Sequence, residues 1–152
     1  MTLSQFVQST DSNRPHYLLL GHPVKHSWSP LMHNIALRHH DIEAEYYAID
    51  VQNNELTDLA SFFNSELFLG ANVTIPYKQS IADYMDGIDS SAREIGAINT
   101  IVKNDYRLEG YNTDYAGFIE PLQAYEFELE GASAVIFGTG GAARAIVYGL
   151  AK

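Results

Sequence analysis

Short apolar runs alternate along this chain with helical patterns, and this alternation limits the fold more than any other feature of the sequence. Residues 17–20, 46–49 and 67–71 are each an apolar run of strand length, and the third strand is expected to continue to Val73. Such runs are typical of strands that are buried on both faces, as in a parallel sheet. Helical patterns of about ten residues follow them, which is the arrangement of an α/β layered domain. The sequence therefore predicts an α/β fold with a mostly parallel sheet in three layers.

Helix start signals mark the segments between these strands. Ser29 is an expected N-cap, because Pro30 follows it at the first helical position. The apolar stripe of this helix is expected to consist of Leu31, Met32, Ile35 and Ala36. Further capping candidates are Asn53 or Asn54, Asp89 or Ser90, and Thr113 or Asp114. The helix after Asp89 is expected to stop near Gly96, since glycine suits the left-handed position after a helix.

One part of the sheet is expected to be antiparallel. Residues 98–102 and 108–111 are strand-like and flank the polar turn 103–107, which is a hairpin signal. We divide the chain into a loose N-terminal tail (residues 1–14), a first domain (15–114), and a bridging helix with the start of a second domain (115–152).

The second domain begins with an apolar run and a glycine-rich turn. Residues 133–137 are expected to form a buried parallel strand, and a helix is expected to run from the turn to the last residue. Gly138, Gly140 and Ala143 match the Gly-x-Gly-x-x-Ala dinucleotide fingerprint between a strand and a helix. A glycine-rich turn without a ligand is the alternative. One strand and one helix cannot complete a nucleotide-binding domain, so we expect a fragment of a longer protein, or a chain that has lost its remainder.

Lys78 is the first candidate for chemistry. Pro76 follows an apolar run and is expected to open a helix, which places Lys78 in the first helical turn. A cation there opposes the helix dipole by a few tenths to about 1 kcal/mol. Either Lys78 is a solvated surface residue that tolerates this cost, or it faces a cleft at the carboxyl end of a strand, where open α/β sheets bind ligands.

Polar residues near other strand ends are further candidates. Ser27 and Ser29 offer two hydroxyls that suit a carboxylate, although Ser29 as a cap alone is the simpler interpretation. Asn99 and Asp114 lie at opposite ends of the hairpin region. Asp114 either caps a helix or faces Lys78, where its charge would raise the lysine pKa against the lowering by burial.

Composition excludes several classes of function. The net charge of -10 without a Lys/Arg cluster disfavours nucleic acid and anionic membranes as partners. No apolar run approaches the about 20 residues of a membrane helix, and residues 1–14 lack the features of a signal peptide. The absence of cysteine rules out disulfides and fits the cytoplasm. The six histidines show no metal-site spacing, so no metal is expected. Exposed apolar surface is expected around Val135, Phe137 and Ile146.

Five motifs in order resemble the shikimate dehydrogenase family. They are residues 21–34 (GHPVKHSWSPLMHN), 72–78 (NVTIPYK), 95–100 (IGAINT), 110–114 (GYNTD) and 138–142 (GTGGA). The resemblance covers residues 17–152. It implies a substrate domain followed by an NADP-binding Rossmann-type domain, and reversible NADP-dependent oxidation of the 3-hydroxyl of shikimate in the shikimate pathway of aromatic amino acid biosynthesis. The main departure is length, since members of the family continue well beyond residue 152, and Thr139 stands where alanine is commoner.

The resemblance also implies roles for individual residues. The catalytic pair is Lys78 and Asp114. The substrate carboxylate is held by Ser27 and Ser29, and the ring hydroxyls by Thr74, Asn99 and Asp114, with Asn72 nearby. The cofactor phosphates are bound by Gly138, Thr139, Gly140, Gly141 and Ala142. Two alternatives stay open: a quinate/shikimate dehydrogenase that uses NAD or NADP, and a non-catalytic substrate-binding fragment. The sequence does not choose between a monomer and a homodimer.

Overall fold

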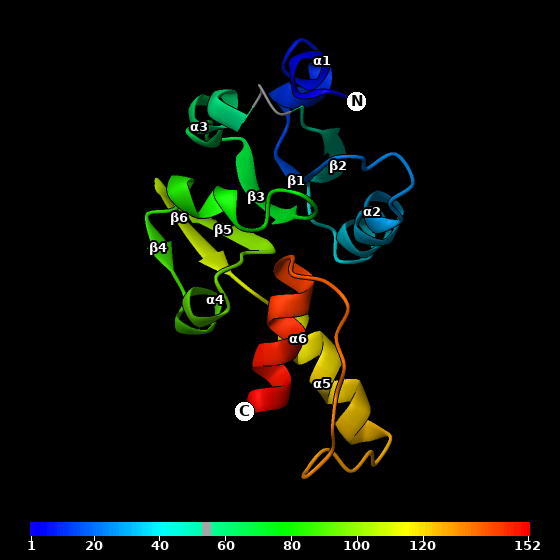
Figure 1. Cartoon of the computed structure of the whole chain (residues 1–152). Helices are drawn as coiled ribbons and strands as arrows, with labels where there is room; N and C mark the ends of the chain where they lie inside the picture. The colour runs from blue at the N-terminus through cyan, green and yellow to red at the C-terminus, as the bar shows by residue number, and fades with distance from the viewer. Residues whose placement is uncertain (53–55) are drawn as a thin grey trace.

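A mixed sheet organises the chain in the computed structural model, which describes residues 1–52 and 56–152 (Figure 1). Its six strands within these residues have the order β2-β1-β3-β5-β6-β4. The strands are β1 (His16–Gly21), β2 (Glu45–Asp50), β3 (Phe68–Val73), β4 (Gly87–Ile88), β5 (Thr100–Asn104) and β6 (Arg107–Tyr111). β1 pairs in parallel with β2 and β3, and β4 pairs in parallel with β6. β5 pairs antiparallel with β3 and β6, which confirms the predicted α/β class and its hairpin.

Helical elements connect these strands. They are α1 (Leu3–Val7), η1 (Thr10–Asn13), α2 (Ser29–His39), α3 (Leu56–Phe63), η2 (Ser80–Tyr84), α4 (Ser90–Ile95), α5 (Asp114–Ala124) and α6 (Gly141–Ala151). The predicted capping of α4 is confirmed, because Asp89 is its N-cap and Gly96 follows it at φ 68°. Asn53 and Asn54 lie outside the described residues.

Side chains of β1 alternate between two apolar layers, as the period of a strand requires. Leu18 and Leu20 join Phe6 of α1 and Leu59 of α3 in the main core. Leu19 points to the other face, where Val24 and Tyr46 pack with Leu37 of α2. The sheet is thus covered on both faces, which confirms the three layers.

The N-terminal residues are not a loose tail, and this prediction was wrong. Thr2 caps α1 with its side chain, and Leu3 and Phe6 are buried in the main core. The Met1 carbonyl accepts a hydrogen bond from the Asp50 amide at 2.8 Å, so the N-terminus lies along β2, the edge strand. Polar composition suggested a tail because the two apolar anchors stand among polar residues.

The expected apolar stripe of α2 does not face the sheet. Leu31, Met32 and Ile35 are all more than half exposed. Asn34 instead attaches α2 to the sheet, because its side chain donates to the Tyr46 carbonyl at 3.0 Å and accepts from the Tyr46 amide at 2.8 Å. The face of α2 that lies on the sheet therefore carries Asn34 and Leu37.

No strand forms at residues 133–137, contrary to the prediction. The chain leaves α5, turns, and returns as an extended segment to α6, whose first residues lie nearest the sheet (Figure 1). Val135 and Phe137 are 80% and 96% exposed, as expected, whereas Ile146 is half-buried. A strand needs a neighbour to satisfy its backbone groups, and the six-stranded sheet does not extend to this segment.

Within the described ranges, no helix combines the length and the apolar character that a membrane crossing needs.

Candidate active site

Lys78 lies in a turn that follows β3 rather than in a helix. Residues 75–79 form turns, and η2 begins only at Ser80, so the predicted helix at Pro76 was wrong. Buried Tyr77 explains the difference, because its hydroxyl donates to the Val51 carbonyl at 2.7 Å and its amide donates to Thr74 O at 3.0 Å. Lys78 therefore does not lie in the first turn of a helix.

The backbone of Lys78 is held from the other side of the site. Its carbonyl accepts a hydrogen bond from the Ile98 amide at 2.6 Å, just before β5. Its alkyl chain packs against the start of α6, where a Cβ added to Gly141 would lie 2.9 Å from the Lys78 Cβ. These contacts fix where the lysine side chain can reach.

Asp114 is positioned by a local turn at the start of α5. Asn112 is buried and accepts a hydrogen bond from the Asp114 amide at 2.9 Å. The other end of the Asn112 side chain donates to Ala97 O at 2.9 Å. Asp114 is the first residue of α5, where the helix dipole favours an anion. Thr113, not Asp114, is the N-cap, and its side chain makes no capping bond.

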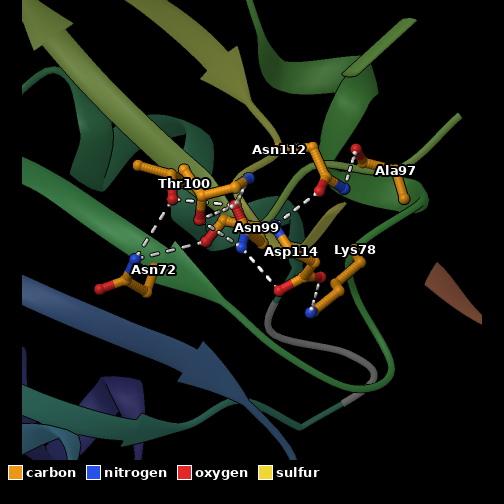
Figure 2. A network of polar contacts seen from close by, with 8 residues as sticks. Asn72, Lys78, Ala97, Asn99, Thr100, Asn112 and Asp114 are labelled. Atoms are coloured by element: carbon orange, nitrogen blue, oxygen red, sulfur yellow. Dashed lines mark hydrogen bonds and ion pairs between the residues drawn. The ribbon is translucent and has the colours of Figure 1, made fainter. Parts of the chain in front are cut away.

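The two side chains meet, as the sequence motifs implied. Lys78 Nζ lies 2.5 Å from Asp114 Oδ2, and the side chains are 14% and 27% exposed. The second oxygen of Asp114 accepts a hydrogen bond from Asn99 Nδ2 at 2.8 Å (Figure 2). An ammonium group has three donors, and one is used here. Protonated Lys78 can therefore hold Asp114 and still donate to a hydroxyl at the same place, whereas only its neutral amine could accept a proton there.

Asn99 links Asp114 to the end of β3. Its side-chain oxygen accepts from the Thr113 amide and from Thr100 Oγ1, both at 2.9 Å. Its backbone carbonyl accepts from the Val73 amide at 2.8 Å and faces the Asn72 side chain at 3.5 Å (Figure 2). Asn72, Lys78, Asn99 and Asp114 thus form one connected polar network.

Ser27 and Ser29 contact each other but not this network. Ser27 Oγ donates to Ser29 Oγ at 3.1 Å and accepts from the Ser29 amide at 3.2 Å. Ser29 is the first residue of α2 and not the expected N-cap, which is Trp28. In the part of the chain that the structure describes, no hydrogen bond joins either serine to Lys78 or Asp114.

Thr74 connects the serine loop with the lysine turn. Its amide donates to Leu20 O at 2.9 Å, and a Cβ added to Gly21 would lie 2.3 Å from its methyl group. The loops that follow β1 and β3 are therefore in direct contact at the carboxyl ends of two neighbouring parallel strands. This is the edge of the sheet where α/β proteins bind their ligands.

The glycine-rich segment has the open turn and helix start that suit a dinucleotide, but not the strand. Gly138 adopts φ 131°, where side chains are rarely found, and a Cβ at Gly140 would meet nothing within 4 Å. α6 begins at Gly141 without a side-chain cap, so its first N–H groups are oriented toward a potential anion. Thr139 and Ala142 are exposed in this turn, and Gly138 and Thr139 help to line a hollow of about 510 Å³. The strand that normally precedes such a turn is not formed.

Sequence reasoning missed the role of Tyr46. This buried tyrosine donates its hydroxyl to Asn72 Oδ1 at 2.8 Å, and burial raises its pKa. It stood in an apolar run that predicted only a strand, so no sequence signal could have found its contact. Among residues 1–52 and 56–152, no group of three or more His, Asp or Glu side chains could hold a metal ion.

Comparison with known proteins shows which family has this sequence and fold. Residues 19–101 match the family described as the shikimate dehydrogenase substrate binding domain. The chain belongs to the shikimate dehydrogenase family. Its curated relatives include the "Shikimate dehydrogenase (NADP(+))" of Salinibacter ruber, which is 50% identical over 133 residues, or 87% of this chain and 47% of that protein. The protein of the same name from Moorella thermoacetica is 48% identical over 133 residues, covering 88% and 45%.

Solved structures of shikimate dehydrogenases share the fold. The enzyme of Aquifex aeolicus superposes with a TM-score of 0.85 at 36% identity, covering 91% of this chain and 52% of that one. The enzyme of Thermus thermophilus, solved in complex with NADP(H) and shikimate, gives 0.80 at 38% identity, covering 90% and 51%. The chain spans about half the length of the shikimate dehydrogenases that it matches.

Proposed function

We propose that this protein serves the NADP-dependent, reversible oxidation of shikimate at its 3-hydroxyl, and that the Lys78–Asp114 pair moves the proton. The observation that carries the proposal is the ion pair itself, at 2.5 Å and partly exposed beside a network of neutral hydrogen-bonding groups. Oxidation of an alcohol needs one proton acceptor next to the hydroxyl. The names of the relatives and the shikimate complex of the Thermus enzyme support the choice of substrate.

In this proposal the serine loop and the network bind opposite sides of the substrate. Ser27 and Ser29 hold the carboxylate, since their hydroxyls lie 3.1 Å apart and can both turn outward to donate. The ring hydroxyls contact Thr74, Asn72, Asn99 and Asp114. Asp114 accepts from a hydroxyl while Asn99 keeps its carboxylate in one orientation.

As a neutral amine, Lys78 Nζ accepts the proton of the 3-hydroxyl in the oxidation, and as an ammonium it returns a proton in the reverse direction. Asp114 holds the Nζ in place and stabilises the ammonium group that forms. NADP, when bound, supplies the hydride acceptor of the reaction. The residues that would hold its phosphates are Gly138, Thr139, Gly140, Gly141 and Ala142, with open space at Gly140 and the N–H groups at the start of α6.

A second candidate is substrate binding without turnover. The specific observation is that residues 133–137 form no strand, so no sheet supports the glycine-rich turn in the described part of the chain. The polar network does not depend on that segment for any of its hydrogen bonds. Binding of the substrate and binding of the cofactor can therefore be separated in this protein.

Steady-state assays with shikimate or quinate, each with NADP or NAD, test the proposal. We expect the highest kcat/KM for shikimate with NADP. A preference for quinate or NAD assigns the protein to the quinate/shikimate branch instead. Saturable shikimate binding without reduction of either cofactor supports the second candidate, and the absence of both binding and turnover in folded protein contradicts both.

A further inference from the structure

The hydroxyl of Tyr46 is a buried donor that the proposed reaction does not use. Tyr46 lies on β2 and is 3% exposed, and its hydroxyl bonds to Asn72 Oδ1 on β3 at 2.8 Å. β1 lies between these two strands, so the contact crosses the face of the middle strand. A buried tyrosine hydroxyl usually has a partner, but this partner is one of the residues at the candidate site.

The surroundings of Asn72 allow only one orientation of its amide. Its nitrogen lies 3.5 Å from the Asn99 backbone oxygen and 3.4 Å from Thr100 Oγ1. A backbone carbonyl can only accept, so the amide nitrogen must face Asn99 and the amide oxygen must face Tyr46. Figure 2 shows the amide nitrogen turned toward Asn99 and Thr100, with the oxygen on the opposite side.

The two bonds on the nitrogen side are long, while the bond on the oxygen side is short. Distances of 3.4–3.5 Å lie beyond the usual range for an N–H···O bond, whereas 2.8 Å is typical for an O–H···O bond. The amide is therefore held mainly through its oxygen. Its N–H groups keep the capacity to donate to a ligand oxygen.

Tyr46 is itself held by the helix that begins with Ser29. Asn34 bonds to both backbone groups of Tyr46, at 2.8 and 3.0 Å. The ring of His33 stacks on the ring of Tyr46 with centroids 4.3 Å apart and an interplanar angle of 11°. α2 therefore contributes the serine side of the site at its first turn and fixes Tyr46 one turn later.

We infer that Tyr46 is a positioning residue, which holds the Asn72 amide so that its N–H groups face the oxygen-rich ring of the substrate. This inference rests on the proposed function, because it names how one of the substrate-binding residues is oriented. Without the hydroxyl, the amide oxygen has no donor and the side chain can rotate. Substrate hydroxyls would then meet a mixture of donors and acceptors.

Tyr46→Phe tests this directly, because it removes only the hydroxyl and keeps the ring on His33. We expect shikimate to bind roughly threefold to tenfold more weakly, the loss of about one hydrogen bond, with little change in melting temperature. Tyr47→Phe is the matched control. Its hydroxyl bonds to Glu45 Oε2 at 2.6 Å, and its ring packs on Phe6 at the other face of the sheet. An equal loss in both variants, or no loss in Tyr46→Phe, would overturn the inference.

A double-mutant cycle with Asn72→Ala shows whether Tyr46 acts through Asn72. If it does, Tyr46→Phe has no further effect on affinity once Asn72 is alanine. Additive losses would show that Tyr46 acts by another route and would overturn the inference.

A measurement without any ligand separates this inference from the proposed function. Nuclear Overhauser effects from the Asn72 side-chain amide protons to Thr100 are expected in the wild type and in Tyr47→Phe, and are expected to weaken in Tyr46→Phe. An unchanged pattern in Tyr46→Phe overturns the positioning role whether or not shikimate binds. If the wild type shows the expected pattern but does not bind shikimate, the positioning role is supported and the proposed function is contradicted.

Discussion

Lys78 Nζ and Asp114 Oδ2 lie 2.5 Å apart although 36 residues separate them in the chain. The lysine comes from the turn after β3, and the aspartate from the first turn of α5. Asn99 joins the two segments, since it bonds to Asp114 and its carbonyl accepts from the Val73 amide of β3. The pair is thus built by the antiparallel part of the sheet, which brings the end of β6 back beside the end of β3.

Lys78→Met tests the role of the ammonium group in proton transfer. Methionine keeps the alkyl packing against Gly141 but removes the proton acceptor. Shikimate oxidation should fall by roughly 10²- to 10⁴-fold, the usual contribution of a positioned acid or base, while shikimate affinity changes much less. Initial-rate kinetics and calorimetry measure the two effects separately.

Lys103→Met is the control for that experiment. Its Nζ donates to Phe63 O and Ser65 O, away from the Lys78–Asp114 network. Turnover in Lys103→Met should stay near the wild-type rate when the protein is folded. Near-normal turnover in Lys78→Met would contradict the catalytic assignment.

Local patterns predicted β1, β2, β3, the β5–β6 hairpin and the α4 cap, because these depend on residues close in sequence. The motifs also predicted that Lys78 and Asp114 act together. The turn at residues 75–79 could not be predicted, since it depends on the bond from Tyr77 to Val51, 26 residues away. The N-terminal segment was misjudged for the same reason: Phe6 is buried only because β1 and α3 enclose it.

The failure at residues 133–137 has a different cause. The sequence of that segment is suited to a buried strand, but a strand also requires a neighbour. The neighbour is not among the described elements of the sheet. Similarly, the contact between Tyr46 and Asn72 joins two strands that are not adjacent, and no local pattern predicts such a pair.

His16 should make the stability of the fold sensitive to acid. It is fully buried among aromatic rings, with Nδ1 2.6 Å from Arg14 O. Burial lowers the pKa of His16, outweighing the hydrogen bond to Arg14, and the charge of Lys103 lowers it further. The unfolded chain binds a proton here near the ordinary value of 6.5, while the folded chain does not. The free energy of unfolding should therefore fall as the pH drops below about 6.5.

Urea unfolding at about pH 7.5 and about pH 5.5 measures this effect. We expect His16→Phe to lose less stability on acidification than the wild type, and His26→Phe, at an exposed position, to match the wild type. If His16→Phe and the wild type lose the same amount, His16 does not contribute to the acid sensitivity.

Two helical glycines test the packing that places α6 beside Lys78. A Cβ at Gly149 in α6 would lie 2.7 Å from Ile119 Cγ1 of α5, whereas a Cβ at Gly117 in α5 would meet nothing within 4 Å. Gly117→Ala should raise the free energy of unfolding by about 0.5–1 kcal/mol through helix propensity. Gly149→Ala should lower it, because overpacking typically costs about 1–3 kcal/mol. Chemical denaturation of both variants measures the two changes in the free energy of unfolding. Equal stabilisation by the two substitutions would mean that α5 and α6 do not pack as described.

Calorimetric titration of this chain with shikimate, without cofactor, tests the central claim most directly. The account predicts saturable binding that weakens by roughly tenfold or more in Ser27→Ala, since that hydroxyl would donate to the substrate carboxylate. Ser133→Ala, at an exposed position outside the site, should bind as the wild type does. No binding by protein shown to be folded by circular dichroism, or equal affinity in Ser27→Ala and the wild type, would contradict the account.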